Sequence, residues 1–308
     1  MNTLIVKLGA SGDVVRTTPL LRRLRGCVTW LTDERNAALL QDLNCDLLCL
    51  SWQERDLLRD RTYDLVINLE DSFEVGHFLA TVESKRLFGA YVGPEKTLRY
   101  TDDSRGWFDL SLISAHGKEA ADNLKLQNRR SYQELVFQGL GLRFEGERYM
   151  LPSPVKTELE GDVAISPEAG PVWPMKNWAC YNRLKQRLEQ RDLKVNVLPK
   201  RSSLLEHLGD VCNHRCLVSG DSLPMHLALG VGTRCVTLFS CTSPWEIHDY
   251  GLQHKIVSPL LEQYFYKRDY DARATAVITV DEVVDAVLRQ LEASAWGARL
   301  QLQSAPAG

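Results

Sequence analysis

The sequence predicts an α/β protein built from two Rossmann-like domains, each a parallel sheet covered by helices. Short runs rich in β-branched residues alternate with helical patterns along the chain, and this alternation restarts after a polar, proline-containing stretch. The 308 residues are enough for two cores of ordinary size. We expect domains at residues 1–150 and 161–292, a linker between them at residues 151–161, and a tail at residues 293–308, of which the last eight, 301–308, are small and polar and expected to be disordered.

Each half of the chain has its own series of elements. In the first half, strands are predicted at residues 4–8, 28–32, 47–50, 65–69 and 87–92, and helices at 13–25, 34–42, 73–83 and 131–142, with a long polar loop over 101–130. In the second half, strands are predicted at residues 163–166, 194–198, 216–219, 235–239 and 255–257, and helices at 177–190, 203–210, 224–229 and 281–291. A ligand of two such domains is expected between them.

Composition and charge exclude several classes of protein. The net charge of −3 argues against a general nucleic-acid binder, because such proteins carry a basic excess. No apolar run approaches the roughly 18 residues of a membrane-spanning helix, and the N-terminus lacks the features of a signal peptide. The eight cysteines are scattered singly, which favours reduced thiols. We therefore expect a cytoplasmic protein.

One cysteine pair invites comparison with a metal site. Cys212, His214 and Cys216 could supply ligands, but their spacing matches no common zinc pattern and no second pair accompanies them. No metal is expected there.

A polar turn in the second half is the strongest pointer to a ligand. The segment Ser219-Gly-Asp-Ser-Leu-Pro-Met-His226 leads from a predicted strand into a helix, so Asp221 and Ser222 lie where the helix begins. The first N–H groups of a helix lack partners within it and bind anions well. The segment therefore predicts a site for a phosphorylated sugar ligand.

A second turn follows the first predicted strand. Gly9 and Gly12 allow a tight turn, and Asp13 falls where the next helix begins. A dinucleotide site is disfavoured because the G-x-G-x-x-G pattern is absent, although acidic residues lie about 20 residues further on. Asp13 suits two roles, a helix cap and a general base, and this turn alone does not choose between them.

Three motifs in register resemble glycosyltransferase family 9, the bacterial heptosyltransferases. The stretch from Leu8 to Leu21, with Gly12-Asp13-Val and Thr17-Thr-Pro-Leu-Leu, resembles the opening of the family. Asp221-Ser-Leu-Pro-Met-His226 is similar to its D-[TS]-x-x-x-H donor motif, and Ser240-Cys-Thr242-Ser-Pro244 is similar to its G-P-T-x-P turn. The resemblance runs from Met1 to about Leu291 and implies a two-domain GT-B fold.

The resemblance also implies a chemistry. Its typical members transfer heptose from ADP-heptose with inversion, without a catalytic metal or cofactor, to the inner core of lipopolysaccharide. Asp13 would be the general base, beside Gly12 on the acceptor side, and Asp221 would contact the donor sugar. Ser222 and the N–H of Leu223 would hold the diphosphate, as preorganised donors at a helix N-terminus can. The remaining donor-side residues would be Ser166, His226 and Thr242, although His226 also suits simple packing in its helix.

The chain departs from the family in two places. Members usually carry a phosphate-binding lysine two residues before the Trp-Pro that is here Trp173-Pro174, and this chain has Pro171 there. Lys176 lies close by and could reach the phosphates, but a loss of donor charge is equally open. The segment from Pro259 to Arg268 lacks the cysteines that many relatives have, which disfavours a structural metal.

The acceptor is left open by the sequence. Arg16, Arg129 and Arg130 lie where they could meet an anionic glycan or glycolipid, with possible peripheral contact at the inner membrane. Some relatives modify proteins or small molecules, so another acceptor or nucleotide sugar is the first alternative. A catalytically weakened subunit that only binds the donor is the second.

Overall fold

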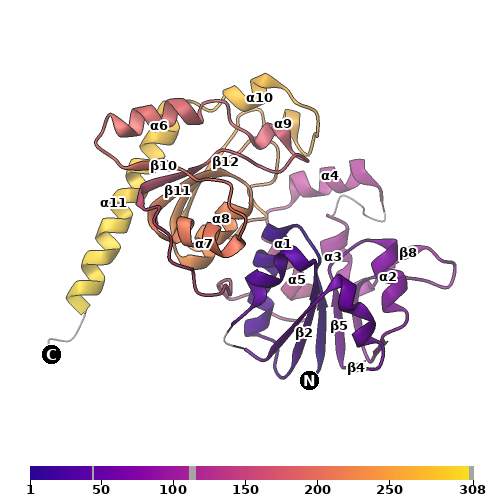
Figure 1. The fold of residues 1–308 in the computed structure, drawn as a ribbon. Coiled ribbons are helices and arrows are strands. Elements are labelled where there is room, and N and C mark those ends of the chain that lie inside the picture. Colours follow the sequence, from indigo (N-terminus) through magenta and orange to yellow (C-terminus); the bar gives the residue numbers. More distant parts are fainter. Residues whose placement is uncertain (44, 111–115, 305–308) are drawn as a thin grey trace. The chain divides into compact units, whose positions relative to one another are not determined.

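The computed structural model describes residues 1–43, 45–110 and 116–304, which form two compact units. Unit 1 comprises Met1–Ser153 together with Trp245–His248, and unit 2 comprises Pro154–Pro244 and Asp249–Gly308 (Figure 1). The α/β class predicted from the sequence is confirmed. The crossing of Trp245–His248 into unit 1 was not predicted.

Unit 1 is built on a six-stranded sheet with the strand order β3-β2-β1-β5-β7-β8. Its strands are β1 (Thr3–Val6), β2 (Val28–Thr32), β3 (Leu47–Ser51), β5 (Leu65–Asn68), β7 (Leu87–Val92) and β8 (Leu98–Tyr100). All pair in parallel except β8, an antiparallel edge strand that the sequence analysis missed. A separate two-stranded sheet pairs β4 (Thr62–Tyr63) with β6 (Glu83–Ser84). The order reverses between β1 and β5, and ligands of such sheets bind at this reversal.

The helical segments of unit 1 depart from prediction in three places, one of them a 3₁₀ helix at residues 52–58 that was not predicted. They are α1 (Ser11–Thr17), η1 (Thr18–Arg22), η2 (Glu34–Leu40), η3 (Trp52–Leu58), α2 (Phe73–Leu79), η4 (Asp102–Ser104), α3 (Arg105–Phe108), α4 (Lys118–Gln127) and α5 (Tyr132–Gly139). The first predicted helix is divided, since Pro19 has no N–H and the chain tightens into a 3₁₀ turn. The predicted loop over 101–130 is wrong at residues 102–108 and 118–127, where η4, α3 and α4 lie, and its residues 111–115 lie outside the described part.

Alternate residues of the central strand bury opposite faces of the unit 1 sheet. Ile5 packs in one cluster with Tyr132, Val136 and other residues of α5, whereas Leu4 packs in another with Phe78 of α2. This period-2 alternation is typical of a sheet with both faces covered. Polar residues follow these apolar strands near the carboxyl ends of β1 and β5.

Unit 2 has a five-stranded, wholly parallel sheet with the order β10-β9-β11-β12-β13. The strands are β9 (Gly161–Ser166), β10 (Val195–Val197), β11 (His214–Gly220), β12 (Arg234–Phe239) and β13 (Gln253–Val257). The order reverses between β9 and β11, so the ends of these two strands form the expected ligand position of this unit.

Helices cover both faces of the unit 2 sheet. They are η5 (Pro174–Lys176), α6 (Tyr181–Glu189), α7 (Leu204–Cys212), α8 (Leu223–Val231), α9 (Leu261–Tyr264), α10 (Ala272–Ala276) and α11 (Val280–Ser304). Figure 1 shows α6 and α11 on one face and α7 and α8 on the other. Helix α11 continues past its predicted end at residue 291 to Ser304, so the predicted tail is helical that far. Residues 305–308 lie outside the described part.

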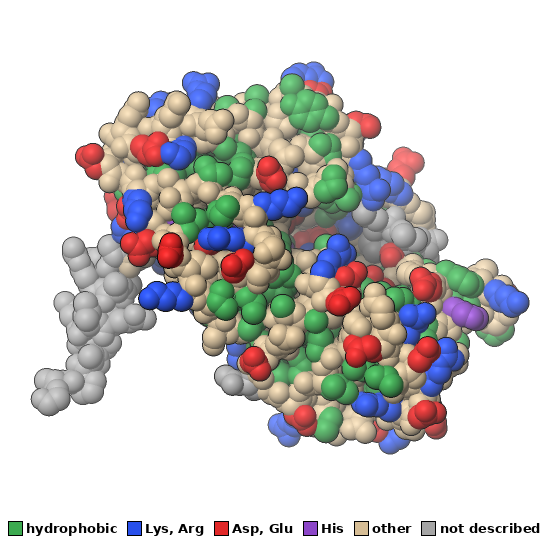
Figure 2. Space-filling view, viewed as in Figure 1, with side chains coloured by type: hydrophobic (Ala, Val, Ile, Leu, Met, Phe, Trp, Pro, Cys, Tyr) green, Lys and Arg blue, Asp and Glu red, His purple; other side chains and the backbone are tan. Residues whose placement is uncertain are grey.

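The surface mixes charges of both signs. On the face drawn in Figure 2, Lys and Arg side chains alternate with Asp and Glu over each unit, as the small net charge leads one to expect. Among the described residues, no helix combines the length and apolar character that crossing a membrane requires.

Candidate active site

The turn after β1 places Asp13 at the start of α1. The helix begins at Ser11 with Ala10 as its N-cap, and no side chain bonds to the cap. Asp13 is thus the third helical residue, and its side chain is 34% exposed. Its carboxylate engages cations, and it is not the N-cap of α1.

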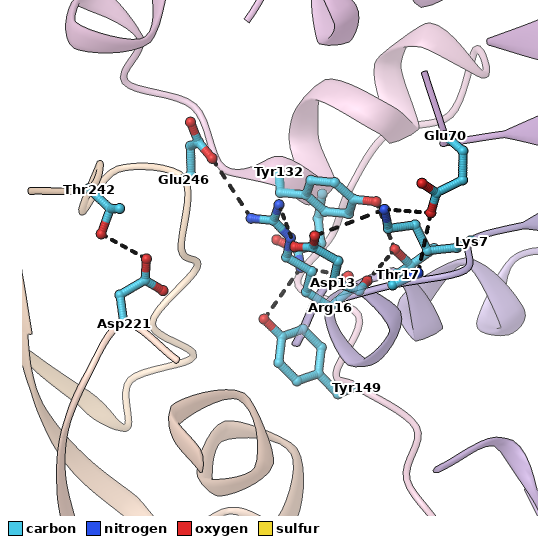
Figure 3. A network of polar contacts seen from close by, with 12 residues as sticks. Lys7, Asp13, Arg16, Thr17, Glu70, Tyr132, Tyr149, Asp221, Thr242 and Glu246 are labelled. Carbon is cyan, nitrogen blue, oxygen red and sulfur yellow. Dashed lines mark hydrogen bonds and ion pairs between the residues drawn. The ribbon is translucent and has the colours of Figure 1, made fainter. Parts of the chain in front are cut away.

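Two cations contact the Asp13 carboxylate, and each is shared with a second carboxylate (Figure 3). Arg16 Nη2 lies 2.8 Å from Asp13 Oδ1, and Lys7 Nζ lies 3.9 Å from Oδ2. Lys7 Nζ donates to Glu70 Oε1 at 2.9 Å, and Arg16 Nη1 lies 3.7 Å from Glu246 Oε2. Burial lowers the pKa of Lys7, but Asp13 and Glu70 outweigh it and the pKa is raised. Lys7 therefore stays charged.

The sheet reversal explains why Lys7 and Glu70 meet. Lys7 follows β1 and Glu70 follows β5, and these neighbouring parallel strands end at the same edge. Glu70 Oε1 also accepts the N–H of Leu8 at 2.7 Å, which fixes the beginning of the turn. The charged residues therefore gather at the ligand position expected for this topology.

An aromatic residue of α5 supports the same cluster from the side. The guanidinium carbon of Arg16 lies 4.2 Å from the centre of the Tyr132 ring, which adds a cation–π attraction. The Tyr132 hydroxyl and Thr17 Oγ1 are 2.7 Å apart, and Thr17 Oγ1 donates to the carbonyl of Asp13. Burial raises the pKa of Tyr132, so its hydroxyl keeps its proton.

In unit 2, the turn after β11 holds Asp221 in a tight polar cluster. Lys176 Nζ donates to Asp221 Oδ2 at 3.0 Å and to the Asp221 carbonyl at 2.7 Å. Thr242 Oγ1 donates to the same Oδ2 at 2.8 Å, as Figure 3 also shows. Burial raises the pKa of Asp221, but the charges of Lys176 and His226 and the two side-chain hydrogen bonds lower it to about 2. Asp221 is thus a fixed negative charge.

The other predicted donor residues lie around this turn. Ser222 is the N-cap of α8, with its hydroxyl directed to the carbonyl of Gly220, and Leu223 is the first helical residue. His226 is buried one turn further along α8. Ser166 ends β9 and pairs in register with Ser219 of β11, so it lies at the sheet reversal.

The predicted acceptor residues are only partly together. Gly12 and Arg16 lie on α1 with Asp13. Arg129 follows α4 and stacks on the Trp245 ring, its guanidinium carbon 3.8 Å from the ring centre. Arg130 is exposed and donates to the carbonyl of Glu134.

Sequence reasoning missed four residues of the unit 1 cluster, namely Lys7, Glu70, Tyr132 and Glu246. A rule that examines the two residues after each strand of a parallel sheet, as the structure bounds the strands, would have found Lys7 and Glu70. No comparable signal marks Tyr132 or Glu246, which come from α5 and from the segment that crosses between units.

The structure also shows how the residues considered for a metal are arranged. Both ring nitrogens of His214 are engaged, with Nδ1 2.6 Å from the Asp210 carbonyl and Nε2 2.9 Å from the Asn196 side chain. Cys216 is buried and Cys212 is exposed. Within the described ranges, no three His, Cys, Asp or Glu side chains group as a metal ion would require.

The match to a known protein family lies almost entirely within one of the two units. Residues 164–275, all but a few of them in unit 2, match the model of glycosyltransferase family 9 (heptosyltransferase). No curated protein sequence matches the chain significantly.

Solved structures resemble the whole chain. A glycosyl transferase family 9 protein from Veillonella parvula DSM 2008 has a TM-score of 0.62 at 15% identity, over 94% of this chain and 97% of that chain. The E. coli heptosyltransferase WaaC with ADP has a TM-score of 0.60 at 16% identity, over 94% of this chain and 100% of that chain. The iron-containing dodecameric glycosyltransferase TibC of E. coli has a TM-score of 0.56 at 12% identity, over 95% and 76%.

At such identities the solved structures establish the fold, which is GT-B-like with two domains. The family itself is indicated by the sequence match in unit 2 and by the three motifs. On these grounds residues 164–275 resemble glycosyltransferase family 9 in sequence, and the chain as a whole shares the fold of solved glycosyltransferases.

Proposed function

We propose that the protein transfers a heptose from ADP-heptose to an acceptor hydroxyl with inversion at the anomeric carbon. The family match supports the reaction class. The donor is supported by similar structures that contain ADP, ADP-2-deoxy-2-fluoro heptose or ADP-D-beta-D-heptose. The proposed acceptor is the inner core of lipopolysaccharide or a related anionic glycan, reached in the cytoplasm or at the inner membrane surface.

The position of Asp13 is the observation that carries this proposal. A general base must reach the acceptor hydroxyl and must be ionised when it does so. The Asp13 carboxylate is 34% exposed, whereas Lys7 and Arg16 beside it are mostly buried. It can therefore receive a proton from an entering hydroxyl while the buried cations hold it in place.

Unit 2 supplies the proposed donor site. Negative charge develops on the departing ADP, and the N–H of Leu223, the first residue of α8, together with the helix dipole suits a diphosphate. Ser222 is the N-cap of this helix and Leu223 is its first residue. Lys176 donates a hydrogen bond to the carbonyl of Asp221, the residue before Ser222. Asp221, held ionised, is suited to accept hydrogen bonds from donor-sugar hydroxyls. Lys176 is the candidate to take the role of the lysine that family members usually carry where this chain has Pro171. Ser166, His226 and Thr242 complete the proposed site.

The acceptor side is proposed from the charge and the position of its residues. Arg16 is occupied by Asp13 and Glu246, so its role is to support the base more than to bind the acceptor. Arg129 and Arg130 are exposed after α4 and remain the candidates to contact an anionic acceptor.

The test compares two aspartates with the same local geometry. Asp13→Asn is assayed for ADP release from ADP-heptose with heptose-deficient lipopolysaccharide core, and for stabilisation by ADP in thermal unfolding. We expect turnover to be lost and stabilisation by ADP to be kept. Asp56→Asn is the control, because Asp56 also pairs with an arginine three residues later at 2.8 Å but lies on η3. Turnover retained by Asp13→Asn would remove Asp13 from the mechanism.

Pro171 stands where family members usually carry a phosphate-binding lysine, so the identity of the donor needs a test of its own. The same thermal measurements with other nucleoside diphosphate sugars and with NAD distinguish the alternatives. Preferential stabilisation by another nucleotide sugar would change the donor and leave the family intact. Equal stabilisation by NAD would contradict the proposed donor site.

A further inference from the structure

The segment Trp245–His248 belongs to unit 1 although the chain on both sides of it belongs to unit 2. It is held by its backbone and by its rings. The N–H of Tyr132 donates to the Glu246 carbonyl at 2.9 Å. Trp245 lies beneath Arg129, and the His248 ring contacts that of Phe144, with centres 5.1 Å apart. The Glu246 side chain is therefore fixed in place.

Glu246 is a buried carboxylate directed at the partner of the proposed base. Its side chain is 7% exposed, and its Oε2 lies 3.7 Å from Arg16 Nη1. The same guanidinium reaches Asp13 with its other terminal nitrogen at 2.8 Å and lies over the Tyr132 ring. Arg16 is thus shared between a buried carboxylate and an exposed one.

We propose that Glu246 is a positioning residue that holds Arg16 and limits the positive charge that Arg16 directs at Asp13. The inference rests on the proposed function, in which Asp13 is the general base. Glu246 does not touch a substrate in this scheme, and it acts only through Arg16.

The physical reason lies in the opposing demands on a base. A cation beside an aspartate lowers its pKa by about 1–3 units, and a weaker base removes a proton from a hydroxyl less effectively. A second carboxylate on the same cation offsets part of this effect. Glu70 acts on Lys7 in the same way, with its Oε1 2.9 Å from Lys7 Nζ.

The cluster around Asp13 contains other charged groups besides Glu246. Groups that interact with Asp13, Lys7 or Arg16 include the cations Lys7, Arg16 and Lys125, the carboxylates Glu70 and Glu246, and the hydroxyl of Tyr132. Lys125 of α4 is buried, and burial lowers its pKa although Glu246 raises it. Asp122 also acts on Lys125, but Glu246 is the carboxylate besides Asp13 that pairs with Arg16.

The test is Glu246→Gln in the full chain, because glutamine keeps the size of the side chain and the backbone bond. The Asp13 carboxyl is titrated by carbon-13 NMR of aspartate-labelled protein, and its signal is assigned by its loss in Asp13→Asn. We expect the pKa of Asp13 to fall by roughly half a unit to one unit. With ADP-heptose and heptose-deficient core, kcat should fall by about three- to tenfold, its acid limb should move to lower pH, and KM should be unchanged.

Two further variants separate charge from structure. Glu246→Asp keeps the negative charge, so the pKa of Asp13 in this variant should be close to that in the wild type. Glu147→Gln is the matched control, because Glu147 is a partly buried partner of Arg23 in the same unit but outside the cluster, so the Asp13 titration should be unchanged.

Failure of the inference is distinguishable from failure of the proposed function. An unchanged or raised Asp13 pKa in Glu246→Gln would overturn the role of Glu246, even if Asp13→Asn is inactive. Turnover retained in Asp13→Asn would instead overturn Asp13 as the base.

Discussion

Replacement of Lys176 by methionine tests the charge arrangement of unit 2 most directly. The change removes the cation and both of its hydrogen bonds to Asp221, at 2.7 and 3.0 Å, but keeps a long apolar side chain. Asp221 would remain mostly buried with Thr242 as its hydrogen-bond partner. We expect the folded state to be destabilised at neutral pH.

The magnitude follows from the pKa of Asp221. Burial raises this pKa, but the Lys176 charge overcomes burial and helps to hold it at about 2, below the ordinary value of 3.8. One pKa unit corresponds to about 1.4 kcal/mol, so ionised Asp221 stabilises the fold by roughly 2 kcal/mol. Because the folded-state pKa is depressed, this contribution is present above about pH 4 and is lost as the pH falls through about 2.

In the variant the sign of the shift reverses. Burial is then opposed by the His226 charge and the Thr242 hydrogen bond without the larger lysine charge, so the pKa of Asp221 should rise above its ordinary value. Breaking a buried pair by removing one partner costs about 3–5 kcal/mol. We therefore expect the variant to be about 3 kcal/mol less stable than the wild type at pH 7. The gap should narrow by about 1 kcal/mol or more at pH 4, where Asp221 of the variant takes up a proton.

The assay is urea unfolding followed by circular dichroism at pH 7 and pH 4. Lys185→Met is the control, because Lys185 of the same unit forms an ion pair with Glu189 that is partly exposed on α6. Such a surface pair contributes less than about 1 kcal/mol. A loss in Lys176→Met equal to that of the control, or a loss that does not depend on pH, would refute the reasoning.

Three further variants test the fold that supports the unit 1 and unit 2 sites. Gly89→Ala should destabilise unit 1 by at least about 3 kcal/mol, measured as soluble yield and melting temperature, because Gly89 has a φ of +115° and an added Cβ would lie 1.8 Å from the Asn68 carbonyl oxygen. Tyr132→Phe should cost about 1 kcal/mol in urea unfolding, because it removes the buried contact with Thr17 Oγ1; no loss would show that this contact is not stabilising. Leu184→Ala should cost roughly 2–5 kcal/mol by the same measurement, because this side chain is fully buried in the unit 2 core; a loss below 1 kcal/mol would contradict that packing.

Local patterns predicted the strands well because buried parallel strands are short, β-branched and bounded by turns. The ranges 28–32 and 87–92 agree with β2 and β7 to the residue. Helix α4 was missed because its sequence is mostly polar and its buried face consists of few residues, Ala121 and Lys125 among them. Its helical character depends on tertiary packing, which the pattern of a single segment does not contain.

Residues of the candidate site were likewise predicted where a local motif contains them, and were missed where their position depends on contacts between distant parts of the chain. Asp13 and Asp221 were predicted as site residues because each lies in a motif next to a strand end. The interaction of Lys176 with Asp221 joins residues 45 positions apart, and sequence proximity suggested only a possible phosphate contact. Glu246 was missed because its role depends on the chain leaving unit 2 for four residues, and no local feature of the sequence indicates that crossing.

The two aspartates are placed in electrostatic environments that suit different roles. Lys176 and Thr242 both act on one oxygen of Asp221, and its pKa of about 2 makes it a poor proton acceptor at neutral pH. Asp13 also has cations beside it, but Lys7 and Arg16 are each shared with a further carboxylate. Environments that drive the proton affinities of two carboxylates apart are a means of dividing roles in an active site. On this argument Asp221 suits the proposed contact with the donor, and Asp13 suits the proposed proton transfer.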